Sequence, residues 1–344
     1  MKGQDAEHGS LDSRPAREAM TGVHTGRKRK GEQPVVPDTE FTSYYGKPVL
    51  NGPVWKSPDV PGYLFLGGVA GASSVLGAGA HATGRNRLAV AAKTGAFGAV
   101  TVSLGALIHD LGRPARFLNM LRVFKPTSPM NMGSWLLTAY GPCAGAAALS
   151  AVTGRLPRIG ALATAGAALT GPAVAAYTAA LVSDTAVPAW HDGHRELPYV
   201  FTGSAAVGAG GLGLLAAPDR EAGPARNLAL FGTVLELAAF RRMERRLGMV
   251  AEPYRAGKPG GMVRAGEALA VAGVAGATLG RRSRVARALS GAGLLAASAL
   301  SKWGIFDAGK VSAEDPKYTI VPQRERLRER ERGGDGWPAG NGAR

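Results

Sequence analysis

The chain has 344 residues, 50 glycines, a single cysteine and a net charge of +16, from 41 Lys and Arg against 25 Asp and Glu. Because Cys143 has no second cysteine to pair with, a disulfide within the chain, a cysteine-ligated iron–sulfur cluster and a cysteine-rich zinc site are excluded. Mean hydropathy is near zero, yet this average joins two polar ends to a middle segment of Ala, Gly, Leu and Val. Such segregation is typical of a membrane domain between polar tails.

The basic surplus does not indicate nucleic acid. The first 60 residues hold nine Lys or Arg, including those of "GRKRKG" at 26–31, against eight Asp or Glu. The tail is therefore mixed rather than a basic arm, and we expect no nucleic-acid partner. It also lacks an apolar stretch followed by a small-residue cleavage site, so we predict no signal peptide and expect the first span to direct insertion.

Apolar stretches of about twenty residues, long enough to cross a bilayer, recur through the middle segment. We predict an all-α integral membrane protein: a polar N-terminal tail at 1–60, a bundle of about eight transmembrane helices at 61–301, and a charged C-terminal tail at 302–344. The spans are rich in Ala and Gly, which favours close helix packing. The predicted spans are 61–83, 88–111, 132–153, 159–182, 198–217, 225–240, 262–280 and 285–301.

An even number of spans places both termini on one side of the membrane, here called the N-side. The loops on the far side are short and hold about ten Lys and Arg, whereas the longer N-side loops hold about eleven. The denser far-side cations favour a cytoplasmic far side, so an extracytoplasmic N-side is slightly favoured, although the nine cations of the N-terminal tail oppose it.

Polar and aromatic residues gather where several spans reach the N-side. "IHDLGRPARF" at 108–117 ends the second span, and "SDTAVPAWHDGHRE" at 183–196 follows the fourth. Ionisable groups near membrane depth are costly unless they face a cavity or each other, so they are functional candidates. These residues are Trp55, Asp59, Tyr63, His109, Asp110, Arg113, Tyr177, Asp184, Trp190, His191 and His194.

Structural roles remain open for some of these residues. Asp110 and Arg113 have the spacing of a helix cap with a local ion pair, and Trp190 suits an interfacial aromatic belt. His191 and His194 have metal-like spacing, but no third ligand lies nearby in the sequence, so we predict no metal site. Haem is not expected either, because His81 and His109 fall on opposite membrane faces.

Three ionisable residues lie deeper, in the sixth and seventh spans. Glu236 and Glu267 fall at similar depth, and Arg264 is positioned to neutralise one of them. The three form either a structural network or part of a proton path. Lys93, early in the second span, is expected to extend toward the far side.

Three stretches together resemble one known family. "YLFLGGVAGAS" at 63–73, "HDLGRPARFLNMLRVFKPTSPMNMGSW" at 109–135 and "AAYTAALVSDTAVPAWHDGHRELPYVFTGSAA" at 175–206 are similar to the NrfD/PsrC family, the integral membrane subunits of polysulfide-reductase-type and related molybdopterin oxidoreductase complexes. The resemblance covers roughly residues 53–250, and its Asp-Leu-Gly-Arg-Pro element at 110–114 is its most specific part.

The resemblance implies an eight-helix subunit that binds menaquinone or ubiquinone near the face where an iron–sulfur subunit docks. That partner would exchange electrons with a molybdopterin (Mo/W) catalytic subunit, in a bacterial inner (cytoplasmic) membrane. Tyr177 matches a family tyrosine associated with the quinone, and Trp190 matches an aromatic before the fifth span. Some members carry Asn and His near the positions of Asp59 and Tyr63, so the resemblance does not identify the quinone's ligands at these positions.

The residues support this independently, because a chain without cluster ligands or a haem pair must meet its electron partner at one face. Quinone reduction also takes two protons, which gives His109, Asp110 and Asp184 a role in delivery. Two alternatives remain: a passive membrane anchor of such a complex, and a small transporter with broken helices, with which the Gly-Pro pairs at 141–142 and 171–172 are compatible. Whether the chain itself is an enzyme is not decided by its sequence.

Overall fold

The structure is a computed structural model that describes residue 50, residues 52–113 and residues 115–332. The predicted N-terminal tail up to position 49, with its basic stretch at 26–31, lies outside these residues, as do Pro114 and the last twelve positions. The described part is helical. Its helices are α1 (Asp59–Ala82), α2 (Asn86–Asp110), α3 (Ala115–Met120), α4 (Pro129–Thr153), α5 (Pro157–Ser183), α6 (Pro188–His191), α7 (Leu197–Ala216), α8 (Gly223–Leu247), α9 (Glu252–Arg255), α10 (Gly257–Leu279), α11 (Arg284–Glu314) and α12 (Lys317–Arg332).

Eight long helices correspond to the eight predicted spans. Within the described residues, six of them, α1, α2, α4, α5, α7 and α10, are both long and apolar enough to cross a membrane. The other two, α8 and α11, carry more charge, since α8 ends in the arginine-rich stretch 241–246 and α11 begins with Arg284 and Arg287. The prediction of an all-α membrane bundle is confirmed, and the chain is a multi-pass membrane protein.

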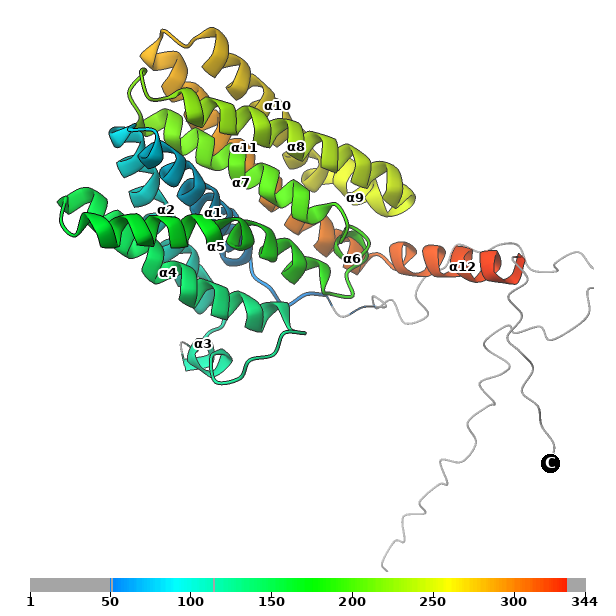
Figure 1. The fold of residues 1–344 in the computed structure, drawn as a ribbon. Coiled ribbons are helices and arrows are strands. Elements are labelled where there is room, and N and C mark those ends of the chain that lie inside the picture. Colours follow the sequence, from blue (N-terminus) through cyan, green and yellow to red (C-terminus); the bar gives the residue numbers. More distant parts are fainter. Residues whose placement is uncertain (1–49, 51, 114, 333–344) are drawn as a thin grey trace, which may run out of the picture. The chain divides into compact units, whose positions relative to one another are not determined.

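The long helices pack as two groups that meet at α1 and α7 (Figure 1). In the first group α1 packs on α2 and α5, and α4 packs on α5; in the second, α8 and α11 pack on α7, and α10 packs on α11. Helices α1 and α7 are the most buried of the apolar spans, because each has neighbours from both groups.

Glycines allow the backbones of these central helices to approach closely. A Cβ atom on Gly71 of α1 would collide with the backbone oxygen of Gly171 on α5. A Cβ on Gly211 of α7 would lie 2.7 Å from the backbone oxygen of Gly291 on α11. Small residues drive helix association in lipid through this kind of packing, which is the structural reason for the Ala- and Gly-rich spans.

The structure differs from the predicted boundaries mainly on the N-side. The loop at 184–196 contains α6, and α8 continues through the predicted loop to Leu247. The largest difference is α11, which runs thirteen residues beyond the predicted end at 301, to Glu314. Its extension buries Ile305, Phe306 and Ala308, so packing rather than the membrane boundary decides where this helix ends.

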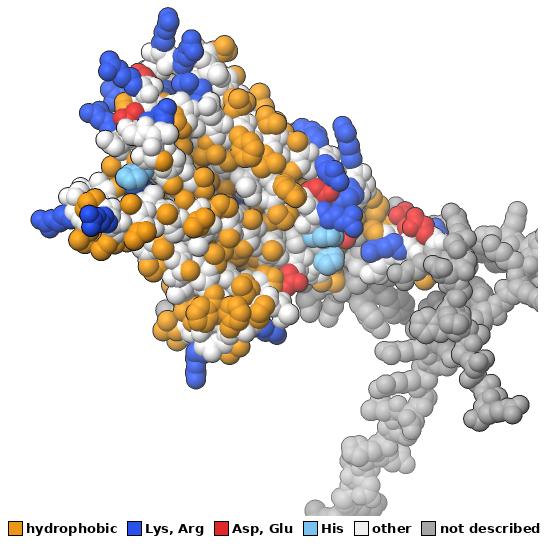
Figure 2. Space-filling view, viewed as in Figure 1, with side chains coloured by type: hydrophobic (Ala, Val, Ile, Leu, Met, Phe, Trp, Pro, Cys, Tyr) orange, Lys and Arg blue, Asp and Glu red, His pale blue; other side chains and the backbone are white. Residues whose placement is uncertain are grey.

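The surface in Figure 2 has a broad apolar zone between two charged zones. Exposed apolar side chains, among them Leu149, Leu162, Leu169 and Val234, lie on the long helices. Lys and Arg gather at both ends of the bundle in the same view. This arrangement is that of a protein whose middle faces lipid chains and whose ends face water and head groups.

Candidate functional site

A cavity of about 530 Å³ opens between α4, α5, α6 and the start of α7, at the end of the bundle that corresponds to the N-side. Its lining is apolar along the walls and polar at the mouth, as expected of a pocket that receives an organic ligand. We call it the Tyr177 pocket. Its lining residues are Pro126, Thr127, Pro129, Met132, Tyr177, Ala180, Ser183, Asp184, His191, His194 and Pro198.

The loop before α4 shapes one wall of this pocket. Ser128 is the N-cap of α4, and its hydroxyl accepts a hydrogen bond from the backbone N–H of Asn131. The Asn131 side chain in turn donates to the carbonyl of Val123, at 2.8 Å, and accepts from the backbone N–H of Lys125, at 2.7 Å. These bonds hold the loop against the helix start, which places Pro126 at the pocket.

Tyr177 forms the inner wall of the pocket. Its ring packs edge-on against Tyr63 of α1, with ring centroids 6.5 Å apart, and Gly133 of α4 leaves the space that the ring fills. The Tyr177 hydroxyl is buried and has no hydrogen-bond partner within the described part of the chain. Burying an unpartnered hydroxyl costs about 1–3 kcal/mol, so this phenol is well suited to donate to a ligand's oxygen.

Three titratable side chains stand at the mouth of the pocket, all of them exposed: Asp184, His191 and His194. His191 Nδ1 lies 3.2 Å from the carbonyl oxygen of Ser183, and His194 Nδ1 lies 3.0 Å from that of His191. Since a carbonyl only accepts, each Nδ1 carries the proton. In the neutral imidazole each Nε2 is then the acceptor nitrogen.

A second polar cluster joins the start of α1 to the end of α2. Asp59 accepts a hydrogen bond from His109 Nδ1 at 2.8 Å, and Asp110 accepts one from the backbone N–H of Lys56 at 3.3 Å. Arg113 is exposed in the turn after α2, and no ion pair joins it to Asp110 in the described chain. None of these residues lines the Tyr177 pocket, so the N-side residues predicted as one site form two clusters.

Trp190 lies in the core rather than at the pocket or at a membrane interface. Its side chain is fully buried, stacks on Trp55 with ring centroids 5.6 Å apart, and donates its indole N–H to the carbonyl of Ile305 at 2.8 Å. Gly309 on α11 leaves room for the indole. The residue therefore anchors α6 on α11.

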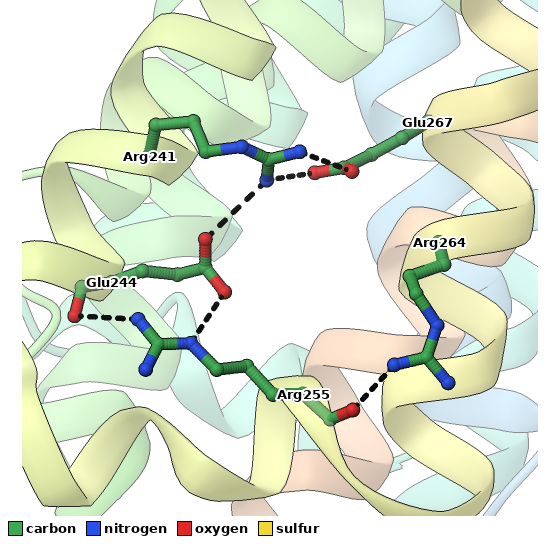
Figure 3. Close-up of polar contacts among 5 residues, drawn as sticks. All are labelled: Arg241, Glu244, Arg255, Arg264 and Glu267. Atoms are coloured by element: carbon green, nitrogen blue, oxygen red, sulfur yellow. Dashed lines mark hydrogen bonds and ion pairs between the residues drawn. The ribbon is translucent and has the colours of Figure 1, made fainter.

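The deep ionisable residues are paired differently from the prediction (Figure 3). Glu267 binds Arg241 through two N–O contacts of 2.7 Å, whereas Arg264 donates to the backbone oxygen of Arg255. Arg255 also contacts Glu244 at 3.0 Å. The resulting chain of contacts ties α8, α9 and α10 together, and Arg264 neutralises no carboxylate in it.

The partner of Glu236 is Lys302, which the sequence analysis assigned to the C-terminal tail at 302–344. Lys302 of α11 is 1% exposed, and it interacts electrostatically with Glu236. Its Nζ atom donates to the backbone oxygen of Phe201 at 3.3 Å and lies 3.5 Å from the centroid of that ring. Lys93 is likewise buried, beside Ser74 and Thr164, rather than extended to the far side.

Sequence reasoning thus found the titratable members of the pocket but missed Lys302 and Arg241. The missed signal for Lys302 was the apolar period that continues past position 301 in "LSKWGIFDAGK". Among the described residues no three His, Cys, Asp or Glu side chains converge to hold a metal ion.

Comparison with known proteins gives one family. The family model described as "Polysulphide reductase, NrfD" matches residues 48–218, which include α1 to α7 and every residue that lines the Tyr177 pocket. A search of curated proteins returns no match. The chain belongs to the NrfD polysulphide reductase family.

Proposed function

We propose that this chain is the membrane subunit of a respiratory oxidoreductase complex, and that the Tyr177 pocket binds the head group of a quinone or quinol. The observation that carries the proposal is the buried Tyr177 hydroxyl, which has no protein partner in the described chain and belongs to a residue that lines a cavity of about 530 Å³. Ligand pockets typically combine an apolar lining with a few orienting polar groups.

The residues of the pocket fit a quinone head group. Pro129, Met132 and Ala180 offer an apolar surface for a flat ring, and the Tyr177 phenol offers one hydrogen-bond donor for a carbonyl oxygen. The Tyr177 hydroxyl would form its hydrogen bond only when a ligand is present. This favours binding of a ligand that carries a hydrogen-bond acceptor.

A bound quinone would supply two-electron, two-proton redox chemistry at this site. In the proposal Tyr177 orients the head group, while Asp184 and His191 hold protons at the mouth of the pocket, where water reaches them. The Nε2 atom of His191 is suited to that exchange because its Nδ1 atom is held by the Ser183 carbonyl. A positioned histidine is the commonest general acid–base group.

The proposed function requires partner subunits that carry the electrons to or from the quinone. The chain has one cysteine, so electrons would come from or go to a cluster in an iron–sulfur subunit that docks at the end of the bundle where the pocket opens. That subunit would connect to a molybdopterin catalytic subunit. We further propose a bacterial inner membrane location with both termini on one side, which the family and the multi-pass fold support.

The test is Tyr177→Phe in the complete complex, compared with Tyr254→Phe, a control whose hydroxyl donates to the Ala189 carbonyl at 2.9 Å away from the pocket. We expect Tyr177→Phe to lower quinone-linked turnover about tenfold, the value of one hydrogen bond, and to lower the amount of quinone that co-purifies. Turnover of the catalytic subunit with an artificial electron carrier should stay unchanged.

A passive anchor predicts that Tyr177→Phe leaves both quinone content and quinone-linked turnover at the wild-type level, and this result would contradict the proposal. The transporter alternative predicted broken helices at the Gly-Pro pairs. Helices α4 and α5 instead run continuously through Pro142 and Pro172, so no observation at these two positions favours a transporter.

A further inference from the structure

A second pocket lies on the same end of the bundle, between the start of α7 and the last third of α8, and its volume is about 470 Å³. We call it the α7–α8 pocket. Its upper rim holds Arg195, Glu196, Tyr199 and Arg242, and its floor consists of small and apolar side chains from α8, namely Leu235, Ala238 and Ala239. The pocket is thus charged at one end and apolar at the other.

The charges at the rim do not cancel. Glu196 forms an ion pair with Arg246, whose guanidinium donates to the carboxylate at 2.9 and 2.6 Å. Arg242 lies farther from Glu196, at 3.7 Å, and its side chain is 82% exposed. Arg195 makes no hydrogen bond or ion pair in the described part of the chain. One carboxylate thus stands among three guanidinium groups, so the rim keeps a surplus of positive charge that an anion can neutralise.

The floor of the pocket continues into a lipid-facing stripe of α8. Leu230, Val234 and Ala238 are exposed and follow one another at intervals of four residues, and Arg242 is the next residue in the same line. Residues four apart lie on the same face of a helix. An apolar line therefore ends at an exposed guanidinium, at the level where the apolar zone meets the charged zone.

Tyr199 adds a polar group at this level, since its side chain is 59% exposed on the first turn of α7. Tyrosine is enriched at the boundary between hydrocarbon and head groups because its ring is apolar and its hydroxyl is polar. A phosphate next to Arg195 and Arg242 could accept a hydrogen bond from such a hydroxyl. The excess positive charge distinguishes this pocket from the Tyr177 pocket, which offers a neutral donor.

We propose that the α7–α8 pocket binds a phospholipid with an anionic head group, with its phosphate at Arg195 and Arg242 and one acyl chain along Ala238, Val234 and Leu230. Basic pockets between transmembrane helices bind such head groups because lipid phosphate and arginine pair strongly next to low-dielectric surroundings. Glu196 and Arg246 form an ion pair beside this site.

The experiment measures lipid binding to the full chain in a neutral detergent by native mass spectrometry, with phosphatidylglycerol and phosphatidylcholine as probes. We expect the wild type to retain phosphatidylglycerol preferentially. Arg195→Gln/Arg242→Gln should weaken that binding about tenfold, since each arginine near the surface adds favourable energy. The control Arg281→Gln/Arg282→Gln removes the same charge at a far-side turn and should change it less than about twofold.

A third variant distinguishes binding of a lipid from binding of free phosphate. Ala239→Phe keeps every charge but fills the apolar floor, so it should weaken phosphatidylglycerol binding and leave any binding of inorganic phosphate unchanged. Equal retention of phosphatidylglycerol by the wild type and Arg195→Gln/Arg242→Gln would overturn the proposal. So would full displacement of the lipid by inorganic phosphate at equal concentration, or an equal loss of binding in the far-side control.

Discussion

The guanidinium of Arg241 on α8 holds both carboxylate oxygens of Glu267 on α10, each at 2.7 Å (Figure 3). Glu267 is only 18% exposed in its side chain, whereas Arg241 is 51% exposed. The pair is therefore a half-exposed clamp between two helices of the second group. Arg241 thus pairs with one of the two carboxylates for which the sequence offered Arg264 as a partner.

Arg241→Gln should lower the free energy of unfolding by about 1 kcal/mol or less, because solvent screens the exposed side of the pair. Thermal unfolding of the full chain in detergent would measure this. Arg245→Gln, on the same helix but exposed, is the matched control and should leave the melting temperature unchanged. A loss as large in Arg245→Gln would show that net charge, rather than the Glu267 contact, accounts for the effect.

Glu236 and Lys302 should behave as one unit, because each is buried and they interact electrostatically. Glu236→Gln alone leaves Lys302 buried without its counter-charge, and we expect a loss of about 3 kcal/mol. Adding Lys302→Met should recover most of that loss, because the double variant buries no unpaired charge. A double-mutant cycle from chemical unfolding measures the coupling; strictly additive losses would contradict it.

Glu196 should make stability depend on pH in the acid range. Hydrogen bonds from Arg246 hold the pKa of the Glu196 carboxyl below its ordinary value of 4.5. A lowered pKa in the folded state means that this stabilisation is present above the ordinary pKa and is lost as the pH falls through the lowered one. The wild type should therefore melt at a higher temperature than Glu196→Gln at pH 7.

The two proteins should converge as the pH falls below 4.5, because protonation makes the Glu196 carboxyl neutral like the glutamine amide. Glu314→Gln, at the exposed end of α11, is the control and should follow the wild type at every pH. A constant difference between wild type and Glu196→Gln from pH 7 into strong acid would rule out this role for the carboxylate charge.

Gly309 should not tolerate a larger side chain, because a Cβ atom at this position would collide with the indole of Trp190. Gly309→Ala would displace the indole from the Ile305 carbonyl, and we expect a loss of about 2 kcal/mol. Gly293→Ala on the same helix meets nothing within 4 Å and should gain about 0.5 kcal/mol from helix propensity. Melting temperatures that shift equally in both variants would contradict the packing argument.

Tyr177→Phe and Tyr254→Phe remove the same atom from different surroundings. The Tyr254 hydroxyl donates to the Ala189 carbonyl, so its loss should cost about 1 kcal/mol. The Tyr177 hydroxyl has no partner in the described chain, so its removal should leave ligand-free stability unchanged or slightly higher. Unfolding of the chain stripped of quinone compares the two; a larger loss for Tyr177→Phe would mean that its hydroxyl has a structural role.

The amino-acid sequence alone predicts the helical membrane fold, because the length of each apolar stretch and the segregation of charge depend only on local composition. It also located the polar residues on one side of the membrane, since counting spans assigns each span end to a face. Tyr177, Asp184 and His191 were found this way, and the structure places all three at one pocket.

Which side chains meet depends on how the helices pack in three dimensions. Asp59 with His109, Arg241 with Glu267, and Lys302 with Glu236 come from helices whose relative rotation is set by packing and not by span order. Trp190 has the chemistry of an interfacial aromatic, yet it is buried against Trp55 and the extension of α11. The spacing of apolar residues along one helix shows which of its faces is buried. Which helix packs on that face depends on close contacts such as that of Gly71 with Gly171, which bring the helices together.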